Sequence, residues 1–484
     1  MKKYAILGLV AMSLTGCDAF MEGFNGTYES ENTANRLADL NDEESCLRQA
    51  QIEDENGNII YIPKISKDAI ALCEAEYAQS PDDIKVAIAF ARTLSQDKER
   101  HDEIEAIISK FEPDDSGQID YVRNVIFLRG DGVDQSDSEA LRLAKQSAQK
   151  GFAPAMNEVG DRIEDSAETE ADKAEAVKWW KMAADAGSSQ GYYNLADAYY
   201  YGYGVEKDET RAREYAKLSA DKGNLKGQNY YGYLFEHGKG GEENETEAFK
   251  YYKLSAEQGF SVAQTNVGVS YYYGTLGVDE DNEKARLWLE KAAKQNNSRA
   301  LYHLGEIYEN GYGVTTDAVL AIHNYRKAAN LNYSRAFDAL GVMAKDGTGM
   351  PQNYELAMDY FKRGLDFDCF NCLPNIGLLY ERGEGVEQDW GKAVEKYIES
   401  AEAGNGWSAD KLGQLYLAGR GVDKDVDLAM TYFLQAVEDS DRESSAKAID
   451  TFILENENWR DLVSTETADK LGEPRAKWRK LSRG

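Results

Sequence analysis

Apolar and small residues along this chain recur at helical spacing, and the helical pattern itself returns every 36 residues. In the stretch LGEIYENGYGV, the side chains of Leu304 and Tyr308 share one face of an α-helix, because residues four apart lie on the same side. Gly311 and Gly313 then form a turn. Similar stretches, LADAYYYGYGV, IGLLYERGEGV and LGQLYLAGRGV, begin at Leu195, Ile376 and Leu412. The recurrence predicts an array of helical repeats.

Nine units fit this period between residues 116 and 440, and only the fifth is longer, by one residue. They begin at Ser116, Phe152, Ser188, Asn224, Phe260, Asn297, Tyr333, Cys369 and Asn405. Position 25 is alanine in all nine, which indicates a contact so close that only a methyl group fits: Ala140, Ala176, Ala212, Ala248, Ala285, Ala321, Ala357, Ala393 and Ala429. Position 21 always holds a residue that can cap a helix N-terminus: Ser136, Asp172, Asp208, Asn244, Asp281, Asp317, Asn353, Asp389 and Asp425. Each unit is therefore expected to contain helix A, a glycine turn, an N-cap, helix B and a closing turn.

The glycine turn could also be a phosphate-binding loop, because glycine lets backbone N–H groups approach a phosphate. Gly-x-Gly stands in seven of the nine units, however, and a phosphate site would not need seven copies. The glycines are expected to allow positive φ or close backbone approach in the turn. Asp at position 21 is interpreted as a helix cap rather than a metal ligand. Asp423-x-Asp425-x-Asp427 resembles a calcium loop but lacks its glycine and its final glutamate.

The pattern A-x-x-x-L-G-x-x-Y-x-x-G-x-G-V-x-x-D-x-x-x-A over residues 116–440 resembles the Sel-one-like repeat (SLR) family, which is related to tetratricopeptide repeats. The departures are local: the second unit lacks Gly-x-Gly, and Ala344 and Met350 replace the core Tyr and the Val of another unit. The resemblance implies an all-α fold, a right-handed α-solenoid that acts as an adaptor or scaffold for other proteins, with no catalytic residues and no cofactor. Some cysteine-rich relatives have been linked to penicillin binding or β-lactam hydrolysis, but their regular cysteine pairs are absent here.

By analogy with tetratricopeptide repeats, the resemblance also places helix A on the concave side, with positions 6, 10, 13 and 14 facing a groove. In units three to six these positions are rich in tyrosine and acidic residues, which suits a peptide groove because tyrosine offers stiff amphipathic contact area. The expected partner-binding residues are Tyr193, Asp197, Tyr200, Tyr201, Tyr233, Glu236, Tyr272, Tyr273, Tyr302, Glu306 and Glu309. Their carboxylates favour a basic segment of a partner. The alternative is that the tyrosines, 31 in the whole chain, are packing residues.

The first residues predict export and lipidation. Two lysines form a positive n-region, residues 4–14 are apolar but too short to span a bilayer, and Leu14-Thr15-Gly16-Cys17 resembles a bacterial lipobox. Residues 1–16 are expected to be a signal peptide, and Cys17 the lipidated first residue of a mature envelope protein that faces the periplasm. Asp18 resembles an inner-membrane retention signal, but that rule varies between bacteria, so both membranes stay open. An ordinary cleaved signal with a chance cysteine is the alternative.

Export implies an oxidising compartment, in which cysteines pair. Four cysteines follow Cys17, and the most local pairing joins Cys46 to Cys73 and Cys369 to Cys372. The Cys369-Phe-Asn-Cys372 motif favours a structural disulfide or two packed thiols over redox catalysis, because no thioredoxin-like βαβ pattern surrounds it. No metal site is expected, because a zinc C-x-x-C needs a second ligand pair and the four histidines are scattered.

The flanking segments complete the predicted organisation. Residues 17–45 are expected to be a lipid-proximal tether, residues 46–115 an N-terminal helical cap, residues 441–471 a C-terminal helical cap, and residues 472–484 a basic tail. The tail is either disordered, docked on the acidic body or in contact with anionic lipid. The net charge of −31 argues against a nucleic-acid partner, because such binding requires neutralised phosphates.

Two functions from different classes remain. The favoured one is a non-enzymatic, lipid-anchored envelope scaffold that binds one or more envelope proteins through its concave face and the membrane through its lipid. The other is an envelope hydrolase or a peptidoglycan- or penicillin-binding protein. The sequence has no recognisable Ser/His/Asp or metal constellation, so we predict that the protein is not an enzyme.

Overall fold

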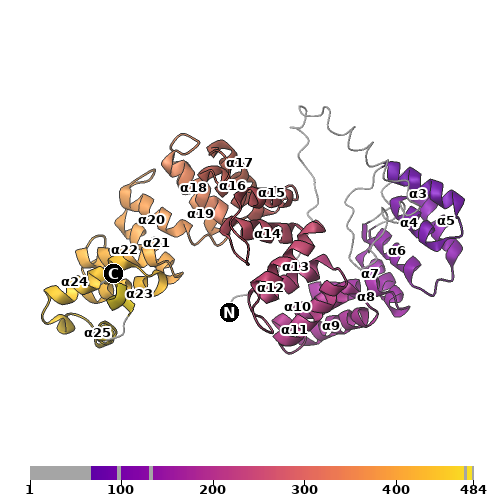
Figure 1. The fold of residues 1–484 in the computed structure, drawn as a ribbon, viewed down its shortest axis with the longest axis horizontal. Helices are drawn as coiled ribbons and strands as arrows, with labels where there is room; N and C mark the ends of the chain where they lie inside the picture. The colour runs from indigo at the N-terminus through magenta and orange to yellow at the C-terminus, as the bar shows by residue number, and fades with distance from the viewer. Residues whose placement is uncertain (1–66, 95–99, 130–134, 474–476, 482–484) are drawn as a thin grey trace. The chain divides into compact units, whose positions relative to one another are not determined.

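The computed structural model describes residues 67–94, 100–129, 135–473 and 477–481, and every regular element within them is a helix (Figure 1). The chain divides after Phe260 into two compact units. Unit 1 contains α3 (Lys67–Gln79), α4 (Ile84–Leu94), α5 (His101–Ile108), the short 3-10 helix η1 (Ser109–Phe111), α6 (Gln118–Arg129), α7 (Asp137–Gln149), α8 (Ala153–Ser166), α9 (Glu170–Asp185), α10 (Ser189–Tyr201), α11 (Glu209–Asp221), α12 (Leu225–Glu236) and α13 (Glu245–Glu257).

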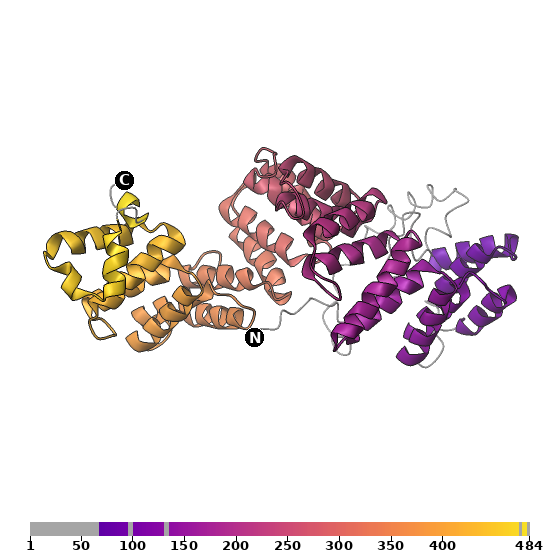
Figure 2. The same ribbon diagram turned by 90° about the horizontal axis from the view of Figure 1, so that it is seen from below.

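Unit 2 contains α14 (Ser261–Tyr273), α15 (Asn282–Ala293), α16 (Ser298–Asn310), α17 (Ala318–Asn330), α18 (Ser334–Asp346), α19 (Tyr354–Leu365), α20 (Cys372–Arg382), α21 (Trp390–Glu402), α22 (Gly406–Ala418), α23 (Val426–Ser440), α24 (Glu443–Glu455), the 3-10 helix η2 (Trp459–Leu462), α25 (Thr465–Gly472) and α26 (Lys477–Leu481). Within each unit, helix A packs on helix B of the same repeat, and helix B packs on the next helix A (Figure 2). The predicted all-α solenoid is confirmed.

The glycine turn shows both predicted properties, positive φ and close packing of the backbone. Gly311 ends α16 with φ of 74°, and its N–H donates to the carbonyl of Ile307 over 2.9 Å. Gly313 has φ of 69°, and a Cβ added there would lie 3.0 Å from the Cβ of Asn282, so the turn also packs closely on the preceding helix B. The N–H of Asp317 closes the turn by donating to the carbonyl of Tyr308 over 2.8 Å.

Helix caps follow the repeat at eight of the nine units, and the prediction for Asp172 is wrong. Thr169 is the N-cap of α9, and its side chain accepts from the N–H of Asp172. The Asp172 carboxylate in turn accepts from the N–H of Thr169 over 2.9 Å, which completes a capping box. The turn of this repeat contains no glycine at all, and its helix B begins three residues earlier, so Asp172 lies in the first turn of that helix.

The core of each repeat is a close contact between helix A and helix B. All nine alanines at position 25 have no exposed surface, as predicted. In six of the nine repeats, a second contact places a ring of helix B over a glycine at position 9 of helix A: a Cβ added to Gly377 would lie 2.5 Å from Cε1 of Tyr397. The hydroxyl of Tyr397 then donates to Glu381 over 2.7 Å. The ring of Tyr397 can therefore be buried because Gly377 has no side chain.

Helical caps flank the repeats. At the N-terminal end, α3, α4 and α5 bury an apolar cluster that includes Cys73, Phe90 and Ile108. At the C-terminal end, α26 buries Trp478 against α23 and α24, and Lys477 pairs with Asp441 over 2.9 Å. The alternative of a disordered tail is therefore wrong for residues 477–481, which dock on the acidic body.

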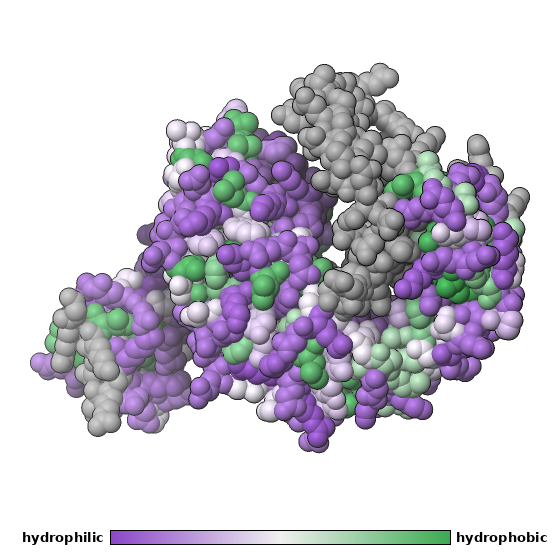
Figure 3. Space-filling model, turned by 45° about the vertical axis from the view of Figure 1, so that its right-hand side comes forward, coloured by the Kyte–Doolittle hydropathy of each residue, from purple (hydrophilic) through white to green (hydrophobic). Residues whose placement is uncertain are grey.

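No described helix is both long enough and apolar enough to cross a membrane. Figure 3 shows a face covered mostly by hydrophilic residues, with hydrophobic side chains in small separate groups.

Candidate partner-binding face

Two consecutive A helices of unit 1 bring four carboxylates together. We call Asp161, Glu164 and Asp165 of α8, with Asp197 of α10, the acidic face. Burial raises the pKa of Asp161 and of Asp197 to about 6. Burial also raises the pKa of Glu164 to about 7, and the charges of the other three add to this rise. Asp161, Glu164 and Asp197 are partly shielded from water, Asp165 is exposed, and the negative charges of the other three disfavour ionisation of Glu164, so a positive group would be bound favourably there.

Hydrogen bonds hold the innermost of these carboxylates. Asp161 Oδ1 accepts from Trp180 Nε1 over 2.8 Å and from Asn194 Nδ2 over 2.9 Å, which ties it to α9 and α10. Asp161, Glu164 and Asp165 were missed from sequence alone. They nevertheless occupy positions 10, 13 and 14 of the second 36-residue repeat. These are the positions at which groove residues are predicted in the later repeats.

Tyrosines of α10 and α12 pack beside the acidic face. Tyr200 is only 9% exposed, its hydroxyl lies 3.2 Å from that of Tyr233, and its ring contacts Tyr230. Tyr193 meets Tyr230 edge-on, with 5.9 Å between ring centroids. Tyr201 is 69% exposed and rests edge-on against Tyr200. Tyr201 therefore offers contact area to a partner, whereas Tyr200 is buried and packs against the ring of Tyr201.

Lysines of the chain itself already lie against these groups. Lys226 Nζ is 5.9 Å from the centroid of the Tyr193 ring. Burial raises the pKa of Asp161, and the charge of Lys226 opposes that rise. Lys207 Nζ lies 5.5 Å from the centroid of the Tyr200 ring. Cations are attracted to aromatic faces, and these contacts indicate the kind of group that the surface accepts.

In unit 2 the corresponding helices hold an aromatic cluster around a buried histidine. Tyr272 and Tyr273 of α14 and Tyr302 of α16 each contact the ring of His303. Glu306 lies 2.7 Å from His303 Nδ1 and accepts from the Tyr302 hydroxyl over 3.0 Å. Tyr273 is 55% exposed and is the ring of this cluster with the most surface available to a partner.

The other two predicted glutamates are tied to helix B. The hydroxyl of Tyr325 donates to Glu309 over 2.7 Å, and that of Tyr252 donates to Glu236 over 2.6 Å. Both tyrosines are almost fully buried, so these bonds belong to the packing of each repeat. The preference for a basic segment is therefore better supported by Asp197 and the rest of the acidic face than by Glu236, Glu306 or Glu309.

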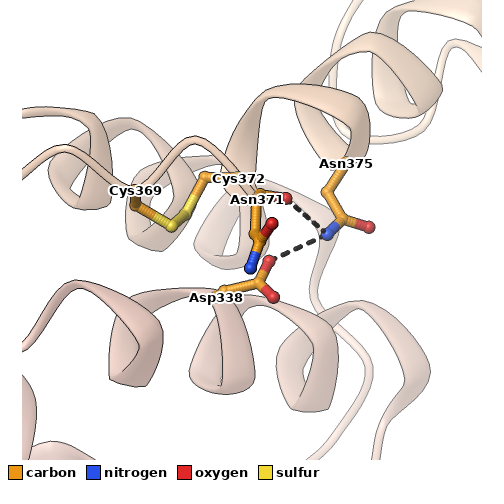
Figure 4. Close-up of a disulfide and its surroundings, with 5 residues drawn as sticks. All are labelled: Asp338, Cys369, Asn371, Cys372 and Asn375. Atoms are coloured by element: carbon orange, nitrogen blue, oxygen red, sulfur yellow. Dashed lines mark hydrogen bonds between the residues drawn. A yellow bond between two sulfur atoms is a disulfide. The ribbon is translucent and has the colours of Figure 1, made fainter. Parts of the chain in front are cut away.

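The C-x-x-C motif lies in unit 2, at the start of α20 (Figure 4). Cys369 and Cys372 are joined by a disulfide and are 3% and 0% exposed. Beside them, burial raises the pKa of Asp338 on α18 to about 6, and Asn375 Nδ2 donates to this carboxylate over 2.9 Å. Cys73 is also disulfide-bonded, but Cys46 and Cys17 lie outside the described residues, so the predicted pairing and lipidation stay predictions.

A family model described as Sel1 repeat matches nine segments: residues 125–152, 153–188, 189–224, 225–260, 261–297, 298–333, 339–366, 375–405 and 408–441. The chain belongs to the Sel1 repeat family. From residue 153 to residue 333, the matched segments begin one residue after the units predicted from the sequence. Sel1 repeat solenoids generally mediate protein–protein interaction and are typically non-catalytic scaffolds.

Solved structures of other Sel1 repeat proteins resemble this chain. A protective antigen present in uropathogenic Escherichia coli strains, which displays an SLR fold, is 24% identical with a TM-score of 0.48, over 87% of this chain and 94% of that one. A Sel1 repeat protein from Oxalobacter formigenes is 24% identical with a TM-score of 0.48, over 66% of this chain and 91% of that one. A search of curated proteins found no match.

Proposed function

We propose that this Sel1 repeat protein is a lipid-anchored, non-catalytic scaffold of the bacterial cell envelope, and that it holds a basic segment of a partner protein against the acidic face. The observation that carries the proposal is the cluster of partly buried carboxylates on α8 and α10. Because burial raises the pKa of Asp161, Glu164 and Asp197, and neighbouring negative charges raise that of Glu164 further, a lysine or arginine brought among them would be strongly favoured.

The tyrosines beside the cluster complete such a site. Tyr201 is exposed next to Asp197, and its ring can cover the apolar stem of a bound lysine or arginine. Lys226 occupies part of this surface in the free protein, so a partner's basic side chain would compete with it. The envelope location is proposed from the lipobox-like sequence before Cys17.

The proposal is tested with a short fluorescent peptide in which lysine and arginine alternate with apolar residues. Binding to the full-length protein should raise the peptide's fluorescence anisotropy and should weaken with added salt. The triple variant Asp161→Asn/Glu164→Gln/Asp197→Asn should bind at least about tenfold more weakly, because each lost charge pair contributes about a kilocalorie per mole or more. A matched peptide carrying glutamate in place of the basic residues should not bind.

The control variant is Glu175→Gln/Glu214→Gln, which removes exposed carboxylates from α9 and α11. It should bind the basic peptide as tightly as the wild type. If the triple variant also binds as tightly, the acidic face is not the site. Covalent labelling of the protein by a fluorescent penicillin would contradict the non-catalytic role.

A further inference from the structure

Three side chains that can bind a metal lie together at the Cys369–Cys372 disulfide of unit 2, a place that we call the disulfide corner. Cys369 follows α19, Cys372 begins α20, and Asp338 reaches the same place from α18 (Figure 4). The sulfur atoms and a carboxylate oxygen all lie within 4.8 Å of one another. From the sequence, no metal site is expected here, because the C-x-x-C has no second cysteine or histidine pair beside it. The fold supplies a carboxylate from the preceding repeat.

Two neighbouring residues, Gly364 and Asn375, position the cysteines and the carboxylate of this corner. Gly364 leaves room for the cysteines: a Cβ there would lie 2.7 Å from Cys372 Sγ and 3.0 Å from the Cβ of Cys369. Asn375 donates from Nδ2 both to Asp338 and to the carbonyl of Asn371, which fixes the carboxylate against the Cys369–Cys372 loop. An outer hydrogen bond of this kind orients the carboxylate ligand of many metal sites.

We propose that, after reduction, Cys369, Cys372 and Asp338 bind one zinc ion, and that the disulfide is the oxidised, metal-free form of this site. A dithiol reductant supplies two electrons and two protons: its own sulfurs become a disulfide, and the protein's S–S bond becomes two thiols. Binding of Zn²⁺ then releases the two thiol protons, and a water molecule takes the fourth position.

Ligand chemistry favours zinc at this site. Two thiolates and a carboxylate match the sulfur and oxygen ligands that zinc accepts in tetrahedral geometry, whereas calcium and magnesium require oxygen ligands throughout. Cys372 lies in the first turn of α20, an eleven-residue helix, and the positive end of the helix dipole stabilises a thiolate there. The burial of both cysteines keeps the thiolates from solvent, which favours a bound cation as their counter-charge.

The test uses the full-length protein with cobalt(II) as a spectroscopic substitute for zinc. The protein is reduced with a phosphine, which is removed without air before cobalt is added. Reduced wild type should bind one equivalent of cobalt at this corner, with the near-ultraviolet absorption of cobalt–thiolate bonds, and Zn²⁺ should displace it. The oxidised protein should give no such band.

Two variants separate this site from the other cysteines. Cys369→Ser/Cys372→Ser leaves the remaining cysteines in place and should lose the cobalt–thiolate absorption assigned to this corner. Asp338→Asn keeps both thiols and a hydrogen-bonding side chain but should bind cobalt at least about tenfold more weakly. Circular dichroism checks that both variants remain helical. If reduced wild type shows no more thiolate absorption than the double variant, or if Asp338→Asn binds as tightly as wild type, the proposal is wrong.

Discussion

At the scale of single residues, the acidic face destabilises the free fold. The pKa of Asp197 is raised by burial from an ordinary value near 4 to about 6, and no hydrogen bond or ion pair from the described part of the chain compensates the carboxylate. Its folded-state pKa therefore exceeds its unfolded-state pKa. Such a group supports the fold fully below about pH 4 and loses that contribution as pH rises through about 6. A residue that costs stability at neutral pH, yet stands among similar ones, is typical of a binding site.

We therefore predict that Asp197→Asn stabilises the protein at pH 7.5 by on the order of 1–3 kcal/mol, since a shift of one pKa unit corresponds to about 1.4 kcal/mol. At pH 4.5 the gain should be much smaller, because the wild-type carboxyl is then largely protonated in the folded protein. Urea unfolding followed by circular dichroism at both pH values measures the difference. Glu175→Gln is the exposed control and should change little at either pH. A variant that is less stable than wild type at pH 7.5 would show that Asp197 makes a favourable contact.

Whether a given side chain is buried or exposed was predictable from the sequence only in part. The repeat register indicated which positions of helix A carry tyrosine, but it could not distinguish Tyr200, which is packed, from its exposed neighbour Tyr201. The distinction depends on Tyr230 and Tyr233, which come from the next helix A and fill the space around Tyr200. Likewise, the hydroxyls that hold Glu236 and Glu309 come from helix B, sixteen residues further along the chain.

At the scale of elements, the fit of helix A to helix B depends on small residues at fixed positions. Alanine at position 25 of all nine repeats and glycine at position 9 of seven are visible in the sequence, and the alanine predicted a close contact correctly. The prediction failed in the second repeat, whose turn contains no glycine: α9 begins earlier and Thr169 replaces Asp172 as the cap. Local turn chemistry therefore decides where a helix starts, while the repeat period decides what it packs against.

One repeat of unit 2 allows a matched test of this fit. Gly377→Ala would force a methyl group against the buried ring of Tyr397, so we expect a loss of about 2 kcal/mol or more in unfolding free energy. Gly391→Ala, in helix α21 of the same repeat, should instead stabilise by up to about 1 kcal/mol, because Gly391 is exposed and alanine is the better helix former. Urea unfolding of the two variants checks the opposite signs. Equal effects would mean that the repeat relaxes around the added methyl group.

At the scale of the whole molecule, the period of 36 residues was enough to predict the fold class. Each repeat contacts mainly its neighbours, so the helices of one repeat can be predicted from the sequence of that repeat alone. The same locality limited the prediction of sites. The meeting of Asp338 with Cys369 and Cys372 joins successive repeats, and nothing in either repeat alone indicates it. The acidic face is similar, since α8 and α10 each supply only part of it.

Charge also bears on how the whole molecule meets a membrane. With a net charge of −31, the chain would be repelled by the anionic lipids of a bacterial leaflet, so electrostatic attraction cannot hold it there. The proposed alternative is a covalent lipid at Cys17. The predicted tether, residues 17–45, would span at most roughly 100 Å when fully extended, which is enough to keep an acidic body clear of the lipid surface.

The anchor is tested by comparing wild type with Cys17→Ala in the bacterial envelope. Wild type should incorporate labelled palmitate and remain with the membranes after a high-salt wash, because several acyl chains hold a protein stably whereas one chain holds it only marginally. Cys17→Ala should incorporate no palmitate and should appear as an unprocessed precursor or as a soluble product. Cys369→Ser/Cys372→Ser is the control for loss of cysteine as such, and it should label like wild type. Wild type that takes up no palmitate, or a Cys17→Ala protein that labels equally, would place the attachment to the membrane elsewhere in the chain or in a partner.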